Sequence, residues 1–235
     1  MIYFSGDTHG LNDFDKLVRL SKEKKHDRND ILIILGDCGV LFIKDEKTYM
    51  AYIKMYEALG FTVFYIDGNH ENFPLIASFP EVEVFGAKAN QIGEHLYHIK
   101  RGEILRIDGY TFLCMGGATS IDKWMRVEGE TWWEEENISE SDMENAWRNL
   151  EKVDYKVDFV LTHCIDSSTV FFGLHFAIDN NTAKLEEIEA KVDYKMWLFG
   201  HYHVDRFLGS KKACLYERVG YLNKDSDILF DWLDL

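Results

Sequence analysis

The amino-acid sequence predicts an α/β fold built around a largely parallel sheet. Short apolar runs alternate with segments of helical spacing through residues 1–90, and several of these runs end directly in polar residues. The chain has 235 residues, enough to bury the core of one large domain without disulfides or other staples. We therefore expect a single domain over residues 1–235.

Strands joined by helices are expected first. A helix is predicted near residues 11–18, with Asn12 as its N-cap, and a second helix is predicted to end at Gly60. Three runs rich in β-branched or aromatic residues predict buried strands: Ile2–Ser5, Ile31–Leu35 and Phe61–Ile66.

The pattern changes at about Val82 to short alternating strands. Asp108-Gly109 is a strong hairpin signal, because both residue types accept the positive φ angles of a two-residue turn. This pair joins the runs Ile104–Ile107 and Tyr110–Met115, and a further strand fits His95–Ile99. A second, antiparallel region is therefore expected.

Helices and strands return in the last hundred residues. Ser139 fits a helix N-cap, with Asp142 at the third helical position. The later elements are predicted as strands at Phe159–Thr162 and Met196–Phe199, a helix between them carrying Leu185, Ile188 and Val192, and closing β structure at Ala213–Val219 and Ile228–Leu233.

Composition limits the setting of the protein. The four cysteines are spread along the chain without a C-x-x-C pair, so neither a zinc knuckle nor a disulfide framework is expected. The residues after Met1 show no basic leader, and no apolar stretch is long enough to cross a bilayer. We expect a cytoplasmic protein without a membrane partner.

The formal charge of −15 disfavours a broad electrostatic grip on nucleic acid, which needs a basic face. Much of the charge is local, because nine acids stand against Arg148 alone between Glu128 and Glu151, a net of −8 that leaves −7 elsewhere. The acids Glu134–Glu136 are interpreted as a solvated helix entrance.

Polar residues of the metal-ligand type follow five strand-like runs, at the point where each run ends. In an α/β sheet the carboxyl ends of neighbouring strands line one edge, so such residues converge in one crevice. Glycines before Asp37, Asn69 and His201 are expected to permit the sharp turn off each strand. The five groups are Asp7-Thr8-His9, Gly36-Asp37, Gly68-Asn69-His70, His163 and Gly200-His201-Tyr202-His203.

These ligand types predict a pair of divalent cations. Imidazole combined with carboxylate and amide oxygen suits Mn²⁺, Fe²⁺/Fe³⁺ or Zn²⁺, whereas an all-oxygen set would favour Mg²⁺ or Ca²⁺. Seven candidate ligands are too many for one ion, and a pair about 3.5–4 Å apart can clamp a phosphoryl group. Two cations bring +4 and Asp7 with Asp37 return −2, which leaves +2 for a hydroxide and a phosphate to neutralise.

The motifs D-x-H, G-D, G-N-H, H and G-H-x-H occur in order along the chain, and they resemble those of the calcineurin-like metallophosphoesterases. The resemblance implies a four-layer α/β/β/α sandwich of two mixed sheets flanked by helices. It also implies that a water bridging two metals attacks phosphorus, while His70 stands beside the metals and assists the leaving group. By the same likeness Asp37 bridges, Asp7, His9 and His203 hold one metal, and Asn69, His163 and His201 hold the other.

One motif departs from the protein serine/threonine phosphatase branch of the family. Gly36–Leu41 resembles that branch at its start, but Val40 and Leu41 stand where the branch has an acid and an arginine. The groups that orient His70 and bind phosphate must therefore come from elsewhere in the chain.

Candidates lie in an insertion expected at about residues 118–150, on the rim of the substrate site. Arg126 could bind phosphate oxygens through its guanidinium, with Lys123 close by, although both are as apt to pair with neighbouring acids. Trp132 and Trp133 cannot both face inward on a regular strand, so stacking on a substrate ring is an even alternative to a core role.

Three functions remain open on the sequence. A metal-dependent phosphatase or phosphodiesterase that acts on a phosphorylated small molecule or a phosphopeptide is favoured by the full ligand set and the acidic surface. The alternative is a nuclease, although the chain lacks the basic track that this would need. A non-catalytic metal-binding scaffold is disfavoured, because the ligand set is intact.

Overall fold

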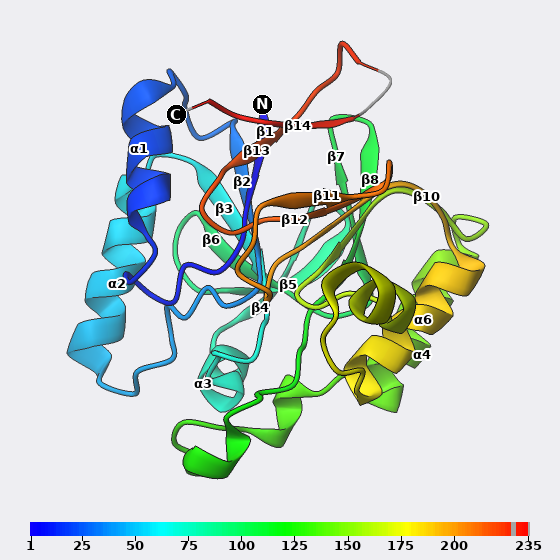
Figure 1. Cartoon of the computed structure of the whole chain (residues 1–235). Helices are drawn as coiled ribbons and strands as arrows, with labels where there is room; N and C mark the ends of the chain where they lie inside the picture. Colours follow the sequence, from blue (N-terminus) through cyan, green and yellow to red (C-terminus); the bar gives the residue numbers. More distant parts are fainter. Residues whose placement is uncertain (227–228, 235) are drawn as a thin grey trace.

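Two mixed β-sheets lie face to face, and helices cover both outer faces (Figure 1). The computed structural model describes residues 1–226 and 229–234. The order of layers, helix, sheet, sheet and helix, confirms the predicted four-layer sandwich of two mixed sheets. No helix in the described part of the chain is long and apolar enough to span a bilayer.

The first sheet has a parallel centre and antiparallel edges. β1, β2, β3 and β6 run parallel, and β1 and β2 are buried throughout, as expected for strands covered on both faces. In spatial order its strands are β14 (Phe230–Trp232), β13 (Gly220–Leu222), β1 (Ile2–Ser5), β2 (Ile31–Leu35), β3 (Thr62–Ile66), β6 (Leu96–Ile99), β5 (Ala87–Gln91) and β4 (Glu81–Val84).

The second sheet is also mixed. β8, β9, β10 and β12 run parallel, while β7 and β11 pair antiparallel at the two edges. In spatial order its strands are β11 (Arg206–Leu208), β12 (Lys212–Cys214), β10 (Asp193–Phe199), β9 (Lys156–Thr162), β8 (Tyr110–Met115) and β7 (Glu103–Ile107).

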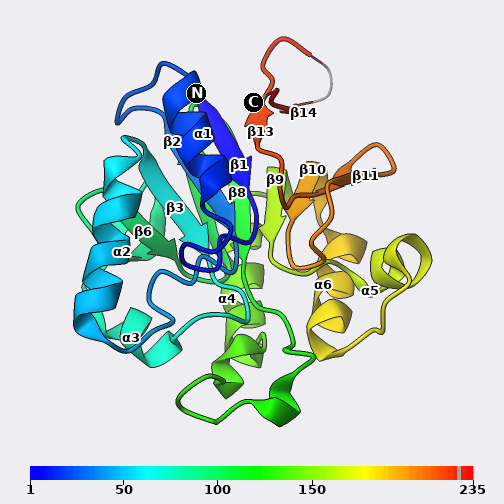
Figure 2. The same ribbon diagram turned by 60° about the vertical axis from the view of Figure 1, so that its left-hand side comes forward.

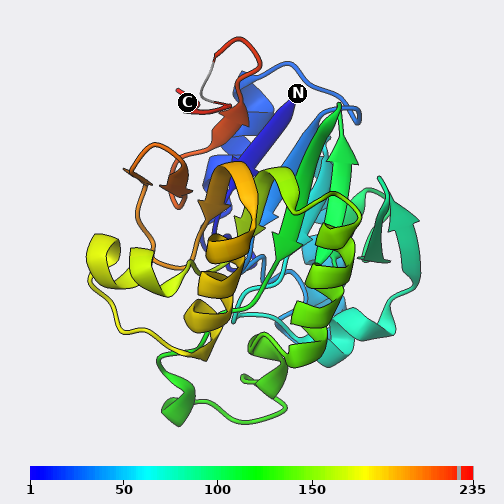
Figure 3. The same cartoon turned by 90° about the vertical axis from the view of Figure 1, so that its right-hand side faces the viewer.

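Three clusters of buried side chains fill the spaces between the layers. Between the sheets, the ring of Phe112 stacks on that of Phe159 with centroids 4.9 Å apart. The outer clusters join α1 and α2 to the first sheet, and α4 and α6 to the second (Figures 2 and 3). The helices are α1 (Asp15–Glu23), α2 (Glu46–Ala58), α3 (Phe73–Ser78), α4 (Glu140–Glu151), α5 (Ser167–Thr169) and α6 (Asn180–Lys191), with short turns η1 (Lys123–Met125), η2 (Glu134–Glu136) and η3 (Val170–Leu174).

Local signals located several elements well. β1 and β2 have the predicted bounds, and β7 and β8 form the predicted hairpin around Asp108-Gly109, whose φ angles are 53° and 82°. Ser139 caps α4 and forms both hydrogen bonds of a capping box with Asp142.

Three expectations about elements are wrong. The N-cap of α1 is Phe14 and not Asn12, because the chain makes a turn before the helix starts. The antiparallel region is divided between the sheets, since β6 pairs parallel with β3. Residues 215–219 connect β12 to β13 and are not a strand. In the last predicted strand, Ile228 lies outside the described residues.

Candidate metal centre

The side chains predicted as metal ligands gather at the carboxyl ends of five strands. β1, β2 and β3 belong to the first sheet, and β9 and β10 belong to the second, so the centre straddles the seam between the sheets. The residues are Asp7 and His9 after β1, Asp37 after β2, Asn69 and His70 after β3, His163 after β9, and His201 and His203 after β10.

Asp37 has a histidine beside each of its oxygens. Its Oδ2 lies 3.3 Å from Nε2 of His9, and its Oδ1 lies 3.3 Å from Nε2 of His163. To one side, Nε2 of His203 lies 3.4 Å from Oδ1 of Asp7. The side chains form three groups, and within each group the atoms that could bind a metal lie within 4.8 Å of one another. The groups are Asp7, His9 and His203; His9, Asp37 and His70; and Asp7, Asp37 and His163.

A buried atom without a partner indicates that these residues fit a cation. Oδ1 of Asn69 is buried and has no hydrogen-bond partner among the described residues, while Nε2 of His163 is buried 3.3 Å from Oδ1 of Asp37. Unpaired buried polar atoms are rare, because each costs free energy unless a ligand satisfies it. Asn69 lines one cleft with Asp37 and His201, so a cation held there would satisfy its oxygen.

The backbone is strained at most of the candidate ligands. Positive φ angles, which non-glycine residues rarely adopt, occur at five of them. Strain of this kind persists only when the surroundings enforce it, and it places these side chains in the crevice instead of along the strand direction. The five are Asp7 (47°), His9 (44°), Asp37 (48°), His201 (67°) and His203 (51°).

The glycines before the candidate ligands are needed mainly because they leave room for neighbouring side-chain atoms. Gly36 has the expected positive φ, 83°. At Gly68 an added Cβ would lie 2.2 Å from Oδ1 of Asp37, and at Gly200 it would lie 2.4 Å from Oδ2 of Asp7. The turn chemistry expected from the sequence thus explains Gly36, whereas Gly68 and Gly200 are needed because ligand atoms pass against their backbone.

Neighbouring groups orient two of the imidazoles. Nδ1 of His163 donates to the carbonyl of Leu35 at 2.8 Å, which leaves Nε2 free to bind a cation. Nδ1 of His9 lies 2.7 Å from the Asp13 carboxylate. The sequence offered a signal for Asp13, an acid four residues after a ligand histidine, which sequence reasoning missed.

The charged groups of the centre shift one another's pKa values. Burial raises the pKa of Asp37, but His163 and His9 outweigh burial and hold it well below its usual range. Burial lowers the pKa of His163, but Asp37 outweighs it and raises the value to about 9. Burial, together with the nearby His163, lowers the pKa of His201 to about 4. At neutral pH and without a cation, the His163 imidazole is therefore positively charged, whereas the His201 imidazole is neutral.

His70 lines a cleft of about 240 Å³ at the centre. Arg126 lines the same cleft, and its Nη2 lies 3.0 Å from Nε2 of His70. Nε of Arg126 donates to Asp122 at 2.7 Å, which fixes the guanidinium. Val40 and Leu41, which replace the acid and the arginine of the phosphatase motif, are buried in the core. The arginine beside His70 comes instead from the connection between β8 and β9.

The other rim candidates lie away from the cleft walls. Trp132 and Trp133 are both buried, because the chain turns into η2 there and does not alternate as a strand would. Nζ of Lys123 lies 3.7 Å from the centroid of the Trp132 ring. Glu136 is buried as well, so the interpretation of Glu134–Glu136 as a solvated helix entrance is wrong for this residue.

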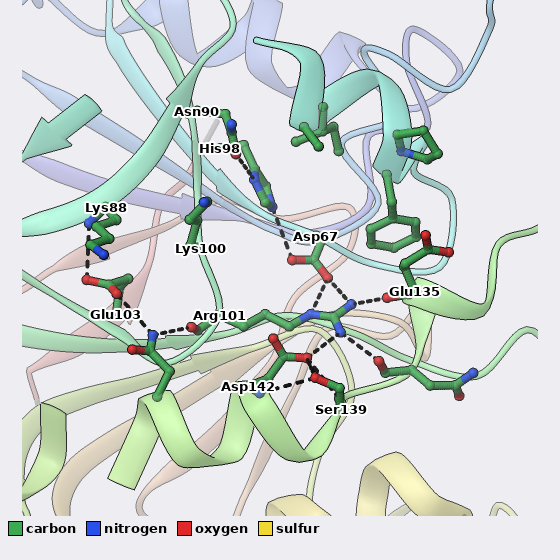
Figure 4. A pocket seen from close by; sticks show the side chains of 16 residues that line it. Asp67, Lys88, Asn90, His98, Lys100, Arg101, Glu103, Glu135, Ser139 and Asp142 are labelled. Atoms are coloured by element: carbon green, nitrogen blue, oxygen red, sulfur yellow. Dashed lines mark hydrogen bonds and ion pairs between the residues drawn. The ribbon is translucent and has the colours of Figure 1, made fainter. Parts of the chain in front are cut away.

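Arg101 links the loop after β3, which carries Asn69 and His70, to the rim segment, a connection that the sequence did not reveal (Figure 4). Its Nε donates at 2.8 Å to Asp67, which precedes Gly68, and other nitrogens donate to Asp142 and to the carbonyls of residues 135–137. Burial raises the pKa of Asp67, but Arg101 outweighs it and lowers the value. A cavity of about 620 Å³ lies beside this pair, and the three ligand sets lie outside it.

Comparison with known proteins identifies a family and a similar fold. A model of the calcineurin-like phosphoesterase family matches residues 1–205, and none of the curated proteins matches the chain. The crystal structure of TT1561 of Thermus thermophilus is similar with a TM-score of 0.58 and 11% identity, over 93% of this chain and 92% of that one. At that identity the likeness shows the fold alone.

The family is one of hydrolases that generally depend on two metal ions. Its model spans the five strand ends that bring the candidate ligands together, from β1 to β10. The chain therefore belongs to the calcineurin-like phosphoesterase family.

Proposed function

We propose that the chain hydrolyses a phosphate mono- or diester with two divalent cations bound in the centre. The convergence of Asp37, Asn69 and His163 carries this proposal, because the buried Oδ1 of Asn69 has no hydrogen-bond partner in the described structure and Nε2 of His163 lies 3.3 Å from Oδ1 of Asp37. Cations such as Mn²⁺, Fe²⁺/Fe³⁺ or Zn²⁺ would activate water and neutralise the charge of the phosphoryl group.

His70 is proposed to stabilise or protonate the departing oxygen. Its imidazole lines the cleft with Nε2 3.9 Å from Oδ2 of Asp37, and imidazole is suited to proton transfer near neutral pH. Arg126 is proposed to bind the phosphate oxygens. To do so, the guanidinium must leave His70 and bind the phosphate. This exchange is favourable because a guanidinium binds an anionic phosphate more strongly than a neutral imidazole.

A small substrate is supported by the size and charge of the site. The cleft of about 240 Å³ has room for a phosphate and a modest organic group, and the exposed side chain of Ile121 forms an apolar part of its wall. The net charge of −15 opposes a long polyanion. A phosphorylated small molecule or a phosphopeptide is therefore the proposed substrate.

The test is hydrolysis of p-nitrophenyl phosphate, bis-p-nitrophenyl phosphate and single-stranded DNA by Mn²⁺-loaded protein. We expect turnover of one or both nitrophenyl esters and its loss in Asp37→Asn. Cutting of DNA alone would support the nuclease instead. Inertness with Mn²⁺, Zn²⁺, Fe²⁺ and Ni²⁺ would overturn the proposal in favour of a scaffold.

A further inference from the structure

Glu136 is a buried carboxylate at the end of an acidic stretch. Its side chain is only 1% exposed. Its Oε1 accepts the backbone N–H of Ser120 at 2.9 Å, and its Oε2 accepts the Ser120 hydroxyl at 2.6 Å. Burying a carboxylate is costly unless its hydrogen bonds are good, and both of these go to one residue beside the metal centre.

Ser120 passes this contact on to Asn69. The hydroxyl has one hydrogen, and it donates this hydrogen in a hydrogen bond to the carboxylate of Glu136, which can only accept. The serine oxygen can then only accept, so the group of Asn69 that lies 3.3 Å from it must be the amide NH₂. The amide oxygen is thereby turned the other way, where it is buried without a hydrogen-bond partner in the described structure.

We propose that Glu136 is a positioning residue, which acts through Ser120 to hold the Asn69 amide with its oxygen toward a cation. The two ends of an amide have nearly the same shape, so packing selects weakly between them and the direction of the hydrogen bonds decides. The oxygen has lone pairs to offer a cation, and the NH₂ group has only donors. This inference rests on the proposed metal centre and adds a residue outside the ligand motifs.

Glu136→Gln tests the direction of the hydrogen bonds with little change in shape. The new amide nitrogen donates to the Ser120 hydroxyl, whose own hydrogen loses its acceptor and is free to turn toward Asn69. Asn69 can accept it only by rotating its amide, which puts NH₂ where the cation would bind. Calorimetric Mn²⁺ titration of metal-stripped protein should show two tight sites in the wild type, with one weakened by about 10- to 100-fold in the variant.

The matched control is Glu135→Gln, the same change at the adjacent exposed acid. It should bind both Mn²⁺ ions as the wild type does. If Glu135→Gln lost as much Mn²⁺ affinity as Glu136→Gln, the loss would be due to the removal of a negative charge alone, and this would overturn the proposal.

Ser120→Ala provides an independent arm, because it removes the hydroxyl that connects Glu136 to Asn69. It should weaken the same Mn²⁺ site, and adding Glu136→Gln should change the affinity by less than about 2-fold further. If Glu136 served folding alone, the single variants would lose thermal stability but keep both Mn²⁺ affinities, which would overturn the proposal. Should Glu136→Gln fail to fold, wild-type affinity in Ser120→Ala would overturn it on its own.

The titration also separates this inference from the proposed function. A wild-type protein that binds no Mn²⁺ would remove the metal centre and the positioning role together. Two equally tight sites in the wild type and in both single variants would remove only the positioning role.

Discussion

Nη2 of Arg126 lies 3.0 Å from Nε2 of His70. A guanidinium can only donate, so Nε2 of His70 accepts and the imidazole proton is on Nδ1. Burial lowers the pKa of His70, Asp37 opposes this effect, and Arg126 reinforces it. Burial and Arg126 both favour the neutral form of His70 at neutral pH, and a phosphate that draws Arg126 away would remove one of these two effects.

Arg126→Met should lower kcat/KM for a nitrophenyl ester by about 10- to 100-fold, because a hydrogen bond to a charged group contributes about 1.5–3 kcal/mol. The limb of the pH profile that reports His70 should move to higher pH, since Arg126 lowers that pKa. Steady-state kinetics across pH would check both. Lys123→Met, which removes a cation packed on Trp132, is the control, and equal losses in the two variants would contradict a specific role.

His70→Ala should leave both cations bound but slow kcat by about 10²- to 10⁴-fold, the usual contribution of a positioned acid or base. Elemental analysis of the purified variant and kinetics under saturating substrate measure the two effects separately. His95→Ala, which removes an imidazole paired with Glu94 outside the centre, should keep full activity. Unchanged turnover in His70→Ala would rule out the assigned role.

Gly68→Ala should abolish tight metal binding while the fold persists. Its methyl group would lie 2.2 Å from Oδ1 of Asp37, 2.4 Å from the backbone nitrogen of Asp37 and 2.7 Å from Nε2 of His163, so both candidate ligands and the main chain after β2 must shift. Gly173→Ala is the matched control, because there the methyl meets the flexible end of the Leu208 side chain. Mn²⁺ titration and circular dichroism of the two variants would check this, and wild-type affinity in Gly68→Ala would refute it.

Arg101→Met should lower the free energy of unfolding by about 3–5 kcal/mol, because it leaves the buried Asp67 carboxylate without its guanidinium and with only the His98 imidazole as a side-chain partner among the described residues. Chemical denaturation of metal-stripped protein measures this without a contribution from bound ions. Lys191→Met breaks an exposed ion pair with Glu187 and should cost no more than about 1 kcal/mol. A similar small cost in Arg101→Met would show that the Asp67 contact is not a structural anchor.

Metal uptake should release protons at neutral pH. The pKa of His163 is raised to about 9 in the absence of a cation, and a cation needs the imidazole neutral. The raised value stabilises the metal-free protein below about pH 6.5, and this contribution is lost as pH rises to about 9. Metal affinity should therefore rise over the same range. Calorimetry in buffers of different ionisation enthalpy measures the released protons, and none at pH 7 would contradict the assignment of His163.

The gathering of the candidate ligand residues at the strand ends could be predicted because each marker is local. Asp37 follows an apolar run whose length and composition indicate a buried strand, and β2 has the predicted bounds. The same holds for the hairpin at Asp108-Gly109, where two adjacent residues determine the turn.

The contacts that connect the rim to the centre could not be predicted, because they join residues far apart in the chain. Arg126 and His70 are 56 positions apart, and no local pattern pairs them. The acids around Glu136 look alike in sequence, yet only the approach of Ser120 makes this one a buried acceptor. Trp132 was ambiguous for a similar reason, since a short turn there replaces the alternation of a strand.

The position of the centre at the seam between the two sheets has a consequence for how the protein unfolds. Cations held by Asp37 from one sheet and His163 from the other would act as a cross-link between them. Opening either sheet alone would then require the release of an ion, so the two halves of the sandwich would lose their structure as one cooperative unit and not in succession.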